Sequence, residues 1–141
     1  MNEKSYSYNE IHTMVEELAP RIQTDCILAI GKGGIIPGAM LSQILNIPFE
    51  ILNYSSKNGK GGKLNCELYK IPILFHDRIL IVDEICDSGH TLKEVFDFYE
   101  CHNEVQTLAL FYKKTSMFEP DYYHTTINDN DGWIHFPWEP K

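Results

Sequence analysis

The chain has 141 residues, 43% of them hydrophobic, which is enough for one folded domain with a buried core. Its formal net charge of −8 argues against a surface built to bind nucleic acid or an anionic membrane. The four cysteines form no CxxC pair, so we expect neither a zinc site nor a disulfide framework. The first residues lack the apolar core of a signal peptide, and no run reaches membrane-spanning length; we expect a cytoplasmic protein without a transmembrane segment.

A helix is predicted close to the N-terminus. Ser7 and Glu10 have the spacing of a capping box, in which each side chain bonds the backbone N–H of the other residue. The apolar residues that follow recur at helical spacing: Ile11, Met14, Val15 and Leu18. We expect these four side chains to form the buried face of the helix.

Strand and helix patterns alternate along the rest of the chain. Strands are expected at 26–30, 49–52, 79–82 and 105–112. Helices are expected from about Pro37, a residue suited to a first helical turn, and after Thr91. The alternation predicts an α/β fold with an open, mostly parallel sheet flanked by helices, and with ligands at the carboxyl ends of the strands. No boundary of a second domain is apparent, so residues 1–141 are expected to form a single domain.

A glycine-rich loop, Gly31-Lys32-Gly33-Gly34, follows the first of these strands and precedes a helix. Backbone N–H groups in such a position can bind an anion. The loop lacks the third glycine of a dinucleotide-binding fingerprint and the Gly-Lys-Ser/Thr ending of a P-loop. Taken alone, it is better explained as a glycine-rich turn with a solvated lysine.

The most informative stretch surrounds the strand at 79–82. Its apolar, mostly β-branched residues predict a strand buried on both faces. Polar residues then follow in the order Asp83, Glu84, Asp87, Ser88, Gly89, His90 and Thr91. Small residues at a helix N-terminus can cradle a phosphate, whereas carboxylates are better matched to hydroxyls, a metal or a proton. A ribose 5-phosphate with a bound cation would use both. The simpler alternative is a polar turn in which Ser88 or Thr91 caps the next helix.

Two segments carry a family resemblance. Asp83-Glu84-x-x-Asp87-Ser88-Gly89-x-Thr91 resembles the phosphoribosyl diphosphate (PRPP) motif of type I phosphoribosyltransferases. Trp133-Ile134-x-x-Pro137-Trp138-Glu139 is similar to the end of the bacterial xanthine–guanine (6-oxopurine) phosphoribosyltransferases. The resemblance is weak only between residues 50 and 75. It implies an Mg²⁺-dependent pentosyltransferase of purine salvage, which moves phosphoribosyl from PRPP to guanine, xanthine or hypoxanthine, with the C-terminal segment as a small hood.

The resemblance also implies roles for single residues at the phosphoribosyl end. Asp87 would be catalytic, as proton acceptor or relay near N7 of the purine. Asp83 and Glu84 would face the ribose hydroxyls and hold Mg²⁺, directly or through water. The 5-phosphate cradle would consist of Ser88, Gly89, His90 and Thr91. Pyrophosphate would bind to Lys32, Gly33 and Gly34, with a cis peptide bond before Lys32 when ligand is bound.

At the purine end, Lys113 would donate to O6, Trp133 would stack on the base, and the backbone carbonyl of Ile134 would meet the substituent at C2. The segment Tyr54–Lys63 would close over the site. Members of the family usually form dimers or tetramers, so the resemblance also implies a homo-oligomer. These roles make PRPP and a purine base the expected substrates.

Two other functions stay open. A non-catalytic PRPP or nucleotide-binding regulator would keep the PRPP motif but add a nucleic-acid surface, for which this chain offers no basic patch. A phosphoribosyltransferase for another base is also possible. Orotate would suit arginines, and the chain has only Arg21 and Arg78. Adenine is disfavoured by Lys113, because an ammonium group cannot accept a hydrogen bond from an amine.

Overall fold

The computed structural model describes residues 3–54, 71–75 and 77–140. Its central sheet has five strands in the order β3-β2-β4-β5-β6, and every neighbouring pair is parallel. The strands are β2 (Cys26–Gly31), β3 (Phe49–Asn53), β4 (Arg78–Cys86), β5 (Glu104–Lys113) and β6 (Tyr122–Ile127). The predicted α/β fold is confirmed, and the described part of this sheet is wholly parallel.

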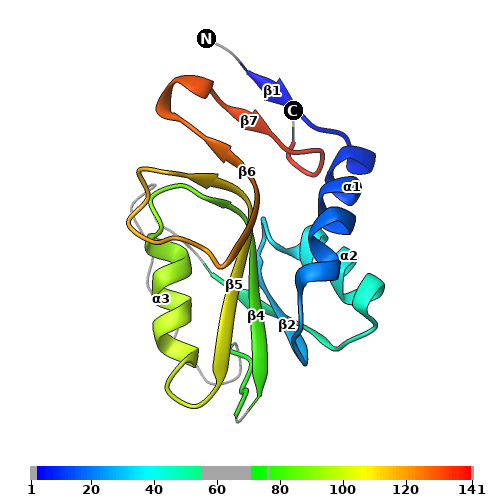
Figure 1. Ribbon diagram of the computed structural model, residues 1–141, viewed down its shortest axis with the longest axis vertical. Helices are drawn as coiled ribbons and strands as arrows, with labels where there is room; N and C mark the ends of the chain where they lie inside the picture. The colour runs from blue at the N-terminus through cyan, green and yellow to red at the C-terminus, as the bar shows by residue number, and fades with distance from the viewer. Residues whose placement is uncertain (1–2, 55–70, 76, 141) are drawn as a thin grey trace.

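Helices cover both faces of the sheet (Figure 1). The pair α1 (Tyr8–Leu18) and α2 (Ile35–Leu45) packs on one face, and α3 (His90–Tyr99) packs on the other. Side chains of β4 alternate between the two: Leu80 and Val82 join the core under α1, whereas Ile79 and Ile81 join the core under α3. An uninterrupted apolar run is what a strand covered on both faces requires, so that prediction is correct.

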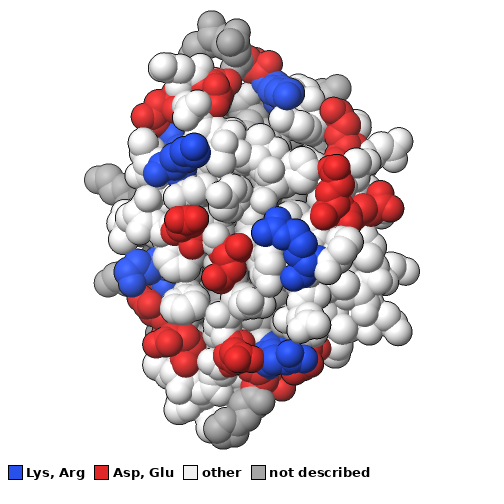
Figure 2. Space-filling model, viewed as in Figure 1, with Lys and Arg blue, Asp and Glu red and all other residues white. Residues whose placement is uncertain are grey.

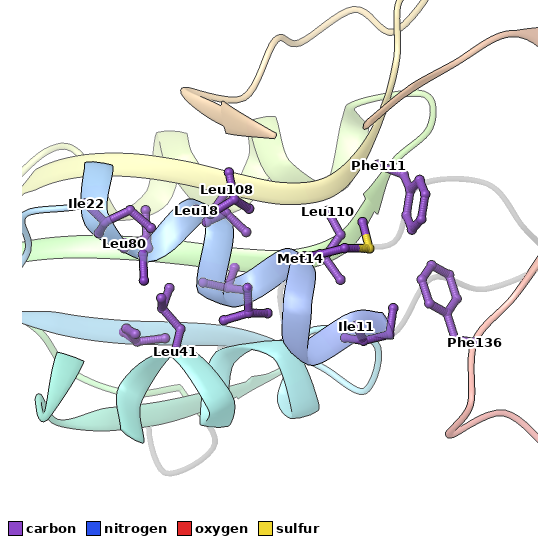
Figure 3. Packing of buried hydrophobic residues seen from close by; sticks show 14 residues of the cluster. Ile11, Met14, Leu18, Ile22, Leu41, Leu80, Leu108, Leu110, Phe111 and Phe136 are labelled. Atoms are coloured by element: carbon purple, nitrogen blue, oxygen red, sulfur yellow. The ribbon is translucent and has the colours of Figure 1, made fainter. Parts of the chain in front are cut away.

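The capping box at the start of α1 forms as predicted. Glu10 donates its N–H to Ser7 Oγ at 3.1 Å, and Ser7 donates its N–H to Glu10 Oε1 at 3.0 Å. The predicted apolar stripe of α1 is buried. Figure 3 shows Met14 and Leu18 of this stripe directed toward the sheet residues in the same cluster. Each such side chain stabilises the fold by roughly 1.5–3 kcal/mol.

The second helix begins earlier than expected. It starts at Ile35, so Pro37 is its third residue rather than its first. Proline is tolerated there because the first four N–H groups of a helix have no partner within it. The helix ends at Leu45, and the left-handed φ of 55° at its C-cap, Asn46, closes the last turn.

Three strands were not predicted. Strand β6 lies at the edge of the main sheet, and the two-residue strands β1 (Lys4–Ser5) and β7 (Ile134–His135) pair in parallel. Figure 1 shows β1 and β7 together beyond one end of the main sheet, which places the N-terminal segment against the C-terminal hood. Two 3₁₀ turns complete the described structure, η1 (Ala19–Arg21) and η4 (Asp129–Asp131).

Two expectations about composition can also be compared with the structure. Cys26, Cys86 and Cys101 are free thiols. No helix in the described part of the chain is both long and apolar enough to cross a membrane.

Candidate active site

Three polar segments meet at the carboxyl ends of three adjacent strands. The glycine-rich loop follows β2, the acidic motif ends β4, and Lys113 ends β5. Since β4 lies between β2 and β5 and all three are parallel, the segments share one edge of the sheet. This is the edge at which open α/β sheets bind ligands.

The first two carboxylates lie inside β4 rather than after it, because the strand continues to Cys86. Asp83 is only 7% exposed, and its Oδ1 accepts a hydrogen bond from the N–H of Glu84 at 2.8 Å. Burial, followed by the charge of Glu84, raises the pKa of Asp83 well above its ordinary value. The two residues thus bring a buried and a half-buried carboxyl group to the same edge.

Asp83 and Glu84 suit Mg²⁺ better than a metal ion whose ligands all come from the protein. Mg²⁺ is usually held by one or two carboxylates and completes its octahedron with water and substrate oxygens. Asp83 and Glu84 supply that number of carboxylates. Within the described ranges, no group of three or more His, Cys, Asp or Glu side chains could hold a metal ion. A cation bound to Asp83 and Glu84 would therefore need further ligands, such as oxygens of a bound substrate.

The glycine-rich loop packs directly against this acidic pair. A Cβ built on Gly33 would overlap the Glu84 carboxylate, and one on Gly34 would overlap the backbone oxygen of Val82. Gly34 donates its N–H to the carbonyl of Ile30 at 2.8 Å, which holds the turn against β2. At Gly34 only glycine allows so close an approach to the backbone, whereas a methyl group at Gly33 would displace the end of the Glu84 side chain. The peptide bond between Gly31 and Lys32 is cis, and Lys32 is exposed.

The loop after β4 leads into α3 with Gly89 as the N-cap, at a φ of 90°. A Cβ on Gly89 would lie 2.5 Å from Ser116 Oγ, so glycine is required by both conformation and space. The structure gives this N-cap no side-chain bond; Ser88 Oγ accepts only the N–H of His90, at 3.3 Å. The N-cap position is thus held by Gly89 rather than by Ser88 or Thr91, although Ser88 still accepts the first N–H of α3. Thr91 is half-buried in the first turn of α3.

At the far side of the motif, Lys113 joins two carboxylates. Its Nζ lies 3.1 Å from Asp87 Oδ1 and 2.9 Å from Asp129 Oδ1. Hydrogen bonds to Asp129 and then to Asp87 raise the pKa of Lys113. Asp129 belongs to η4, which leads within four residues to Trp133. Sequence reasoning missed Asp129; its only signal was an acidic turn, Asn128–Asp131, just before the hood.

The hood offers one exposed indole and one packed indole. Trp133 is 63% exposed, whereas Trp138 stacks on Phe136 with ring centroids 4.9 Å apart and planes 13° apart. The strand β1 fixes the backbone here: Lys4 donates to the Trp133 carbonyl and Tyr6 to the His135 carbonyl, both at 3.0 Å. Backbone groups alternate in direction along a strand, so the Ile134 carbonyl is directed away from β1.

The family model described as the phosphoribosyl transferase domain matches residues 7–141. The chain belongs to the phosphoribosyltransferase family. It is 29% identical to hypoxanthine-guanine phosphoribosyltransferase of Schizosaccharomyces pombe, over 96% of this chain and 88% of that protein. It is also 29% identical to xanthine-guanine phosphoribosyltransferase of Idiomarina loihiensis, over 94% and 84%.

Solved structures agree with this family. A purine phosphoribosyltransferase from Pyrococcus horikoshii superposes with a TM-score of 0.82 at 27% identity, covering 100% of this chain and 97% of that one. A hypothetical protein from Neisseria gonorrhoeae with bound ppGpp gives a TM-score of 0.76 at 26% identity, covering 99% and 90%.

The predicted site residues of this phosphoribosyltransferase gather in two groups. The glycine-rich loop contacts the acidic motif through Gly33 and Glu84, and the acidic motif contacts the lysine through Asp87. Trp133 and Ile134 lie in the hood, which continues from η4. Residues 55–63 of the predicted closing segment fall outside the described residues, so its role as a lid stays a prediction.

Proposed function

We propose that this phosphoribosyltransferase transfers the 5-phosphoribosyl group of PRPP to a 6-oxopurine, which is guanine, xanthine or hypoxanthine. The products are the nucleoside monophosphate and pyrophosphate, as purine salvage requires. The observation that carries the proposal is the junction of Lys113 with Asp87: a donor-only ammonium beside a carboxylate, at the end of the PRPP motif. The names of the relatives in Schizosaccharomyces pombe and Idiomarina loihiensis support the same class of base.

The base would lie between the lysine and the hood. Lys113 donates to the carbonyl oxygen at C6, which accepts, whereas the exocyclic amine of adenine only donates. Trp133, which is exposed, offers a flat face for stacking, an interaction worth about 1–3 kcal/mol per base. The Ile134 carbonyl, directed away from β1, is available to accept from a donor at C2 such as the amine of guanine.

The phosphoribosyl group would extend from the base toward α3. Backbone N–H groups of the first turn of α3, together with Ser88 and Thr91, would bind the 5-phosphate. Gly89 and His90 belong to the same cradle. The buried Asp83 and its neighbour Glu84 would accept hydrogen bonds from the ribose hydroxyls and hold Mg²⁺. When bound, Mg²⁺ supplies positive charge to the oxygens of the pyrophosphate group.

In the reaction, a purine ring nitrogen forms a bond to C1 of PRPP while the bond from C1 to the pyrophosphate oxygen breaks. Asp87 accepts the proton that leaves the imidazole ring at N7. The carboxylates beneath the ribose favour the positive charge that develops at C1. Lys32 and the backbone N–H group of Gly33 bind the departing pyrophosphate, which stabilises its negative charge. The N–H of Gly34, which the sequence also assigned to pyrophosphate, is instead bonded to the Ile30 carbonyl.

The finer parts of the proposal rest on the family resemblance. They are the dependence on Mg²⁺, a cytoplasmic location, and assembly as a homodimer or homotetramer. A chelator added to an active preparation tests the first part, since activity should disappear and return when Mg²⁺ is added in excess.

An assay of pyrophosphate release tests the reaction itself. The purified chain is incubated with PRPP, Mg²⁺ and guanine, and binding of PRPP is measured in parallel by calorimetry. We expect pyrophosphate and guanine nucleotide in equal amounts, and no release without the base. Binding of PRPP without any turnover would instead favour the non-catalytic regulator. The Neisseria gonorrhoeae protein with bound ppGpp shows that this fold can bind a nucleotide of another kind.

A further inference from the structure

Lys113 sits where three parts of the chain meet: the end of β5, the loop before α3 and the turn η4. Its ammonium group touches one carboxylate from each of the other two parts, Asp87 at 3.1 Å and Asp129 at 2.9 Å. The side chain of Lys113 is only 25% exposed, whereas both carboxylates are mostly exposed. The lysine is therefore the fixed member of the group, and the carboxylates approach it from two sides.

We infer that Asp129 is a positioning residue for base recognition, which directs the ammonium group of Lys113 toward O6 of the purine. The inference rests on the proposed function and adds a residue to it. An ammonium group has three N–H donors. Two are engaged by Asp87 and Asp129, which leaves one donor in a direction that the two carboxylates define together.

Without Asp129, Lys113 would keep Asp87 as its one carboxylate partner at this junction. The ammonium group would then be free to rotate about that single contact, and it would bind more strongly to the carboxylate proposed to accept the N7 proton. Asp129 thus competes with Asp87 for the ammonium group, which weakens the interaction between Lys113 and Asp87.

The turn that carries Asp129 is itself held in place. Asn128 donates its N–H to Asp131 Oδ2 at 2.6 Å, and Asp131 donates its N–H to the Asn128 carbonyl at 3.1 Å. Trp133 follows after Gly132, and its carbonyl accepts the N–H of Lys4. The turn η4 therefore positions both Asp129, which contacts Lys113, and Trp133, which is proposed to stack on the base.

The test is a kinetic comparison of Asp129→Asn with the unmodified enzyme. The KM for guanine should rise about 3- to 10-fold, the size expected when a partly exposed lysine loses one charge-assisted hydrogen bond, while the KM for PRPP stays within about twofold. Asp129→Glu, which restores the carboxylate, should recover most of the lost affinity for guanine.

A matched control is available on α3. Lys93 and Asp97 form an exposed pair with the same separation of 2.9 Å, and Asp97 lies in the last turn of α3. Asp97→Asn removes an equivalent interaction and should leave both KM values unchanged. Asp129→Asn should also have no further effect in a Lys113→Ala background, because the two substitutions act through one contact.

The possible results distinguish a failure of the inference about Asp129 from a failure of the proposed reaction. An unchanged guanine KM in Asp129→Asn, or the same rise with and without Lys113, would overturn the role of Asp129 while leaving the proposed reaction intact. If the unmodified chain forms no nucleotide at all, the proposed function fails, and the inference fails with it.

Discussion

At the residue scale, the site depends on which groups each carboxylate contacts. Asp83 is buried and bonded to the next residue along the strand, whereas Asp87 is exposed and bonded to Lys113. On this contrast, the proposed function gives Asp83 the role of holding ligands and Asp87 that of exchanging a proton with the base.

Asp87→Asn tests that assignment. The amide keeps the size of the side chain but does not accept the N7 proton, so kcat should fall by about 10²- to 10⁴-fold, the usual contribution of a general base. Binding of PRPP, measured by calorimetry, should survive because Asp83 and Glu84 remain. A kcat close to that of the unmodified enzyme would contradict the role of Asp87.

Two glycines offer a contrast between function and stability. In Gly33→Ala, the new methyl group meets the end of the Glu84 side chain, which can move aside; the melting temperature should stay nearly unchanged while the KM for PRPP rises. In Gly38→Ala, it would lie 2.9 Å from Ala29 Cβ and 3.0 Å from the Phe49 ring, in the packing between α2 and the sheet. This variant should lose about 1–3 kcal/mol of stability through overpacking. Thermal melts and PRPP kinetics on both variants measure the two effects; the opposite pattern would show that Gly33 is a structural glycine.

At the scale of elements, we expect the two tryptophans of the hood to have different roles. Trp133→Ala removes the exposed indole and should raise the KM for the purine more than the KM for PRPP. Trp138→Ala removes a ring stacked on Phe136, which itself packs against Phe111 at 5.7 Å, and should lower the melting temperature instead. Figure 3 shows the Phe111 and Phe136 rings next to one another at one end of the cluster, and their planes are 66° apart. A larger effect on PRPP in Trp133→Ala would place the base elsewhere.

Elements with a strong local pattern were predictable, and those without one were not. The capping box and apolar stripe specify α1, and the apolar run of β4 requires cover on both faces. Strand β6 was missed because its polar and aromatic residues are half-buried at a sheet edge and show no clean alternation. The strands β1 and β7 are two residues long and exist through pairing between the two ends of the chain. Asp129 was missed for the same reason, since it acquires its partner only when η4 folds over the end of β5.

At the scale of the whole molecule, an acidic protein must bind an acidic substrate. The net charge of −8 gives no general attraction for PRPP. Figure 2 shows acidic and basic side chains interspersed over one face, with no broad basic area among the described residues in view. Binding must therefore come from local groups at the carboxyl edge of the sheet: the backbone N–H groups of two loops, Lys32, and the proposed Mg²⁺. This local design suits a small anionic substrate.

The measurement that tests the account most directly is a competition among bases in one reaction. Guanine, xanthine, hypoxanthine and adenine are mixed at equal concentrations with PRPP, Mg²⁺ and the enzyme, and the nucleotides formed are separated and quantified. The product ratios then give the relative kcat/KM values. We predict 6-oxopurine nucleotides and at most a trace of adenine nucleotide. Adenine nucleotide as a major product, or no nucleotide from any base, would contradict the account.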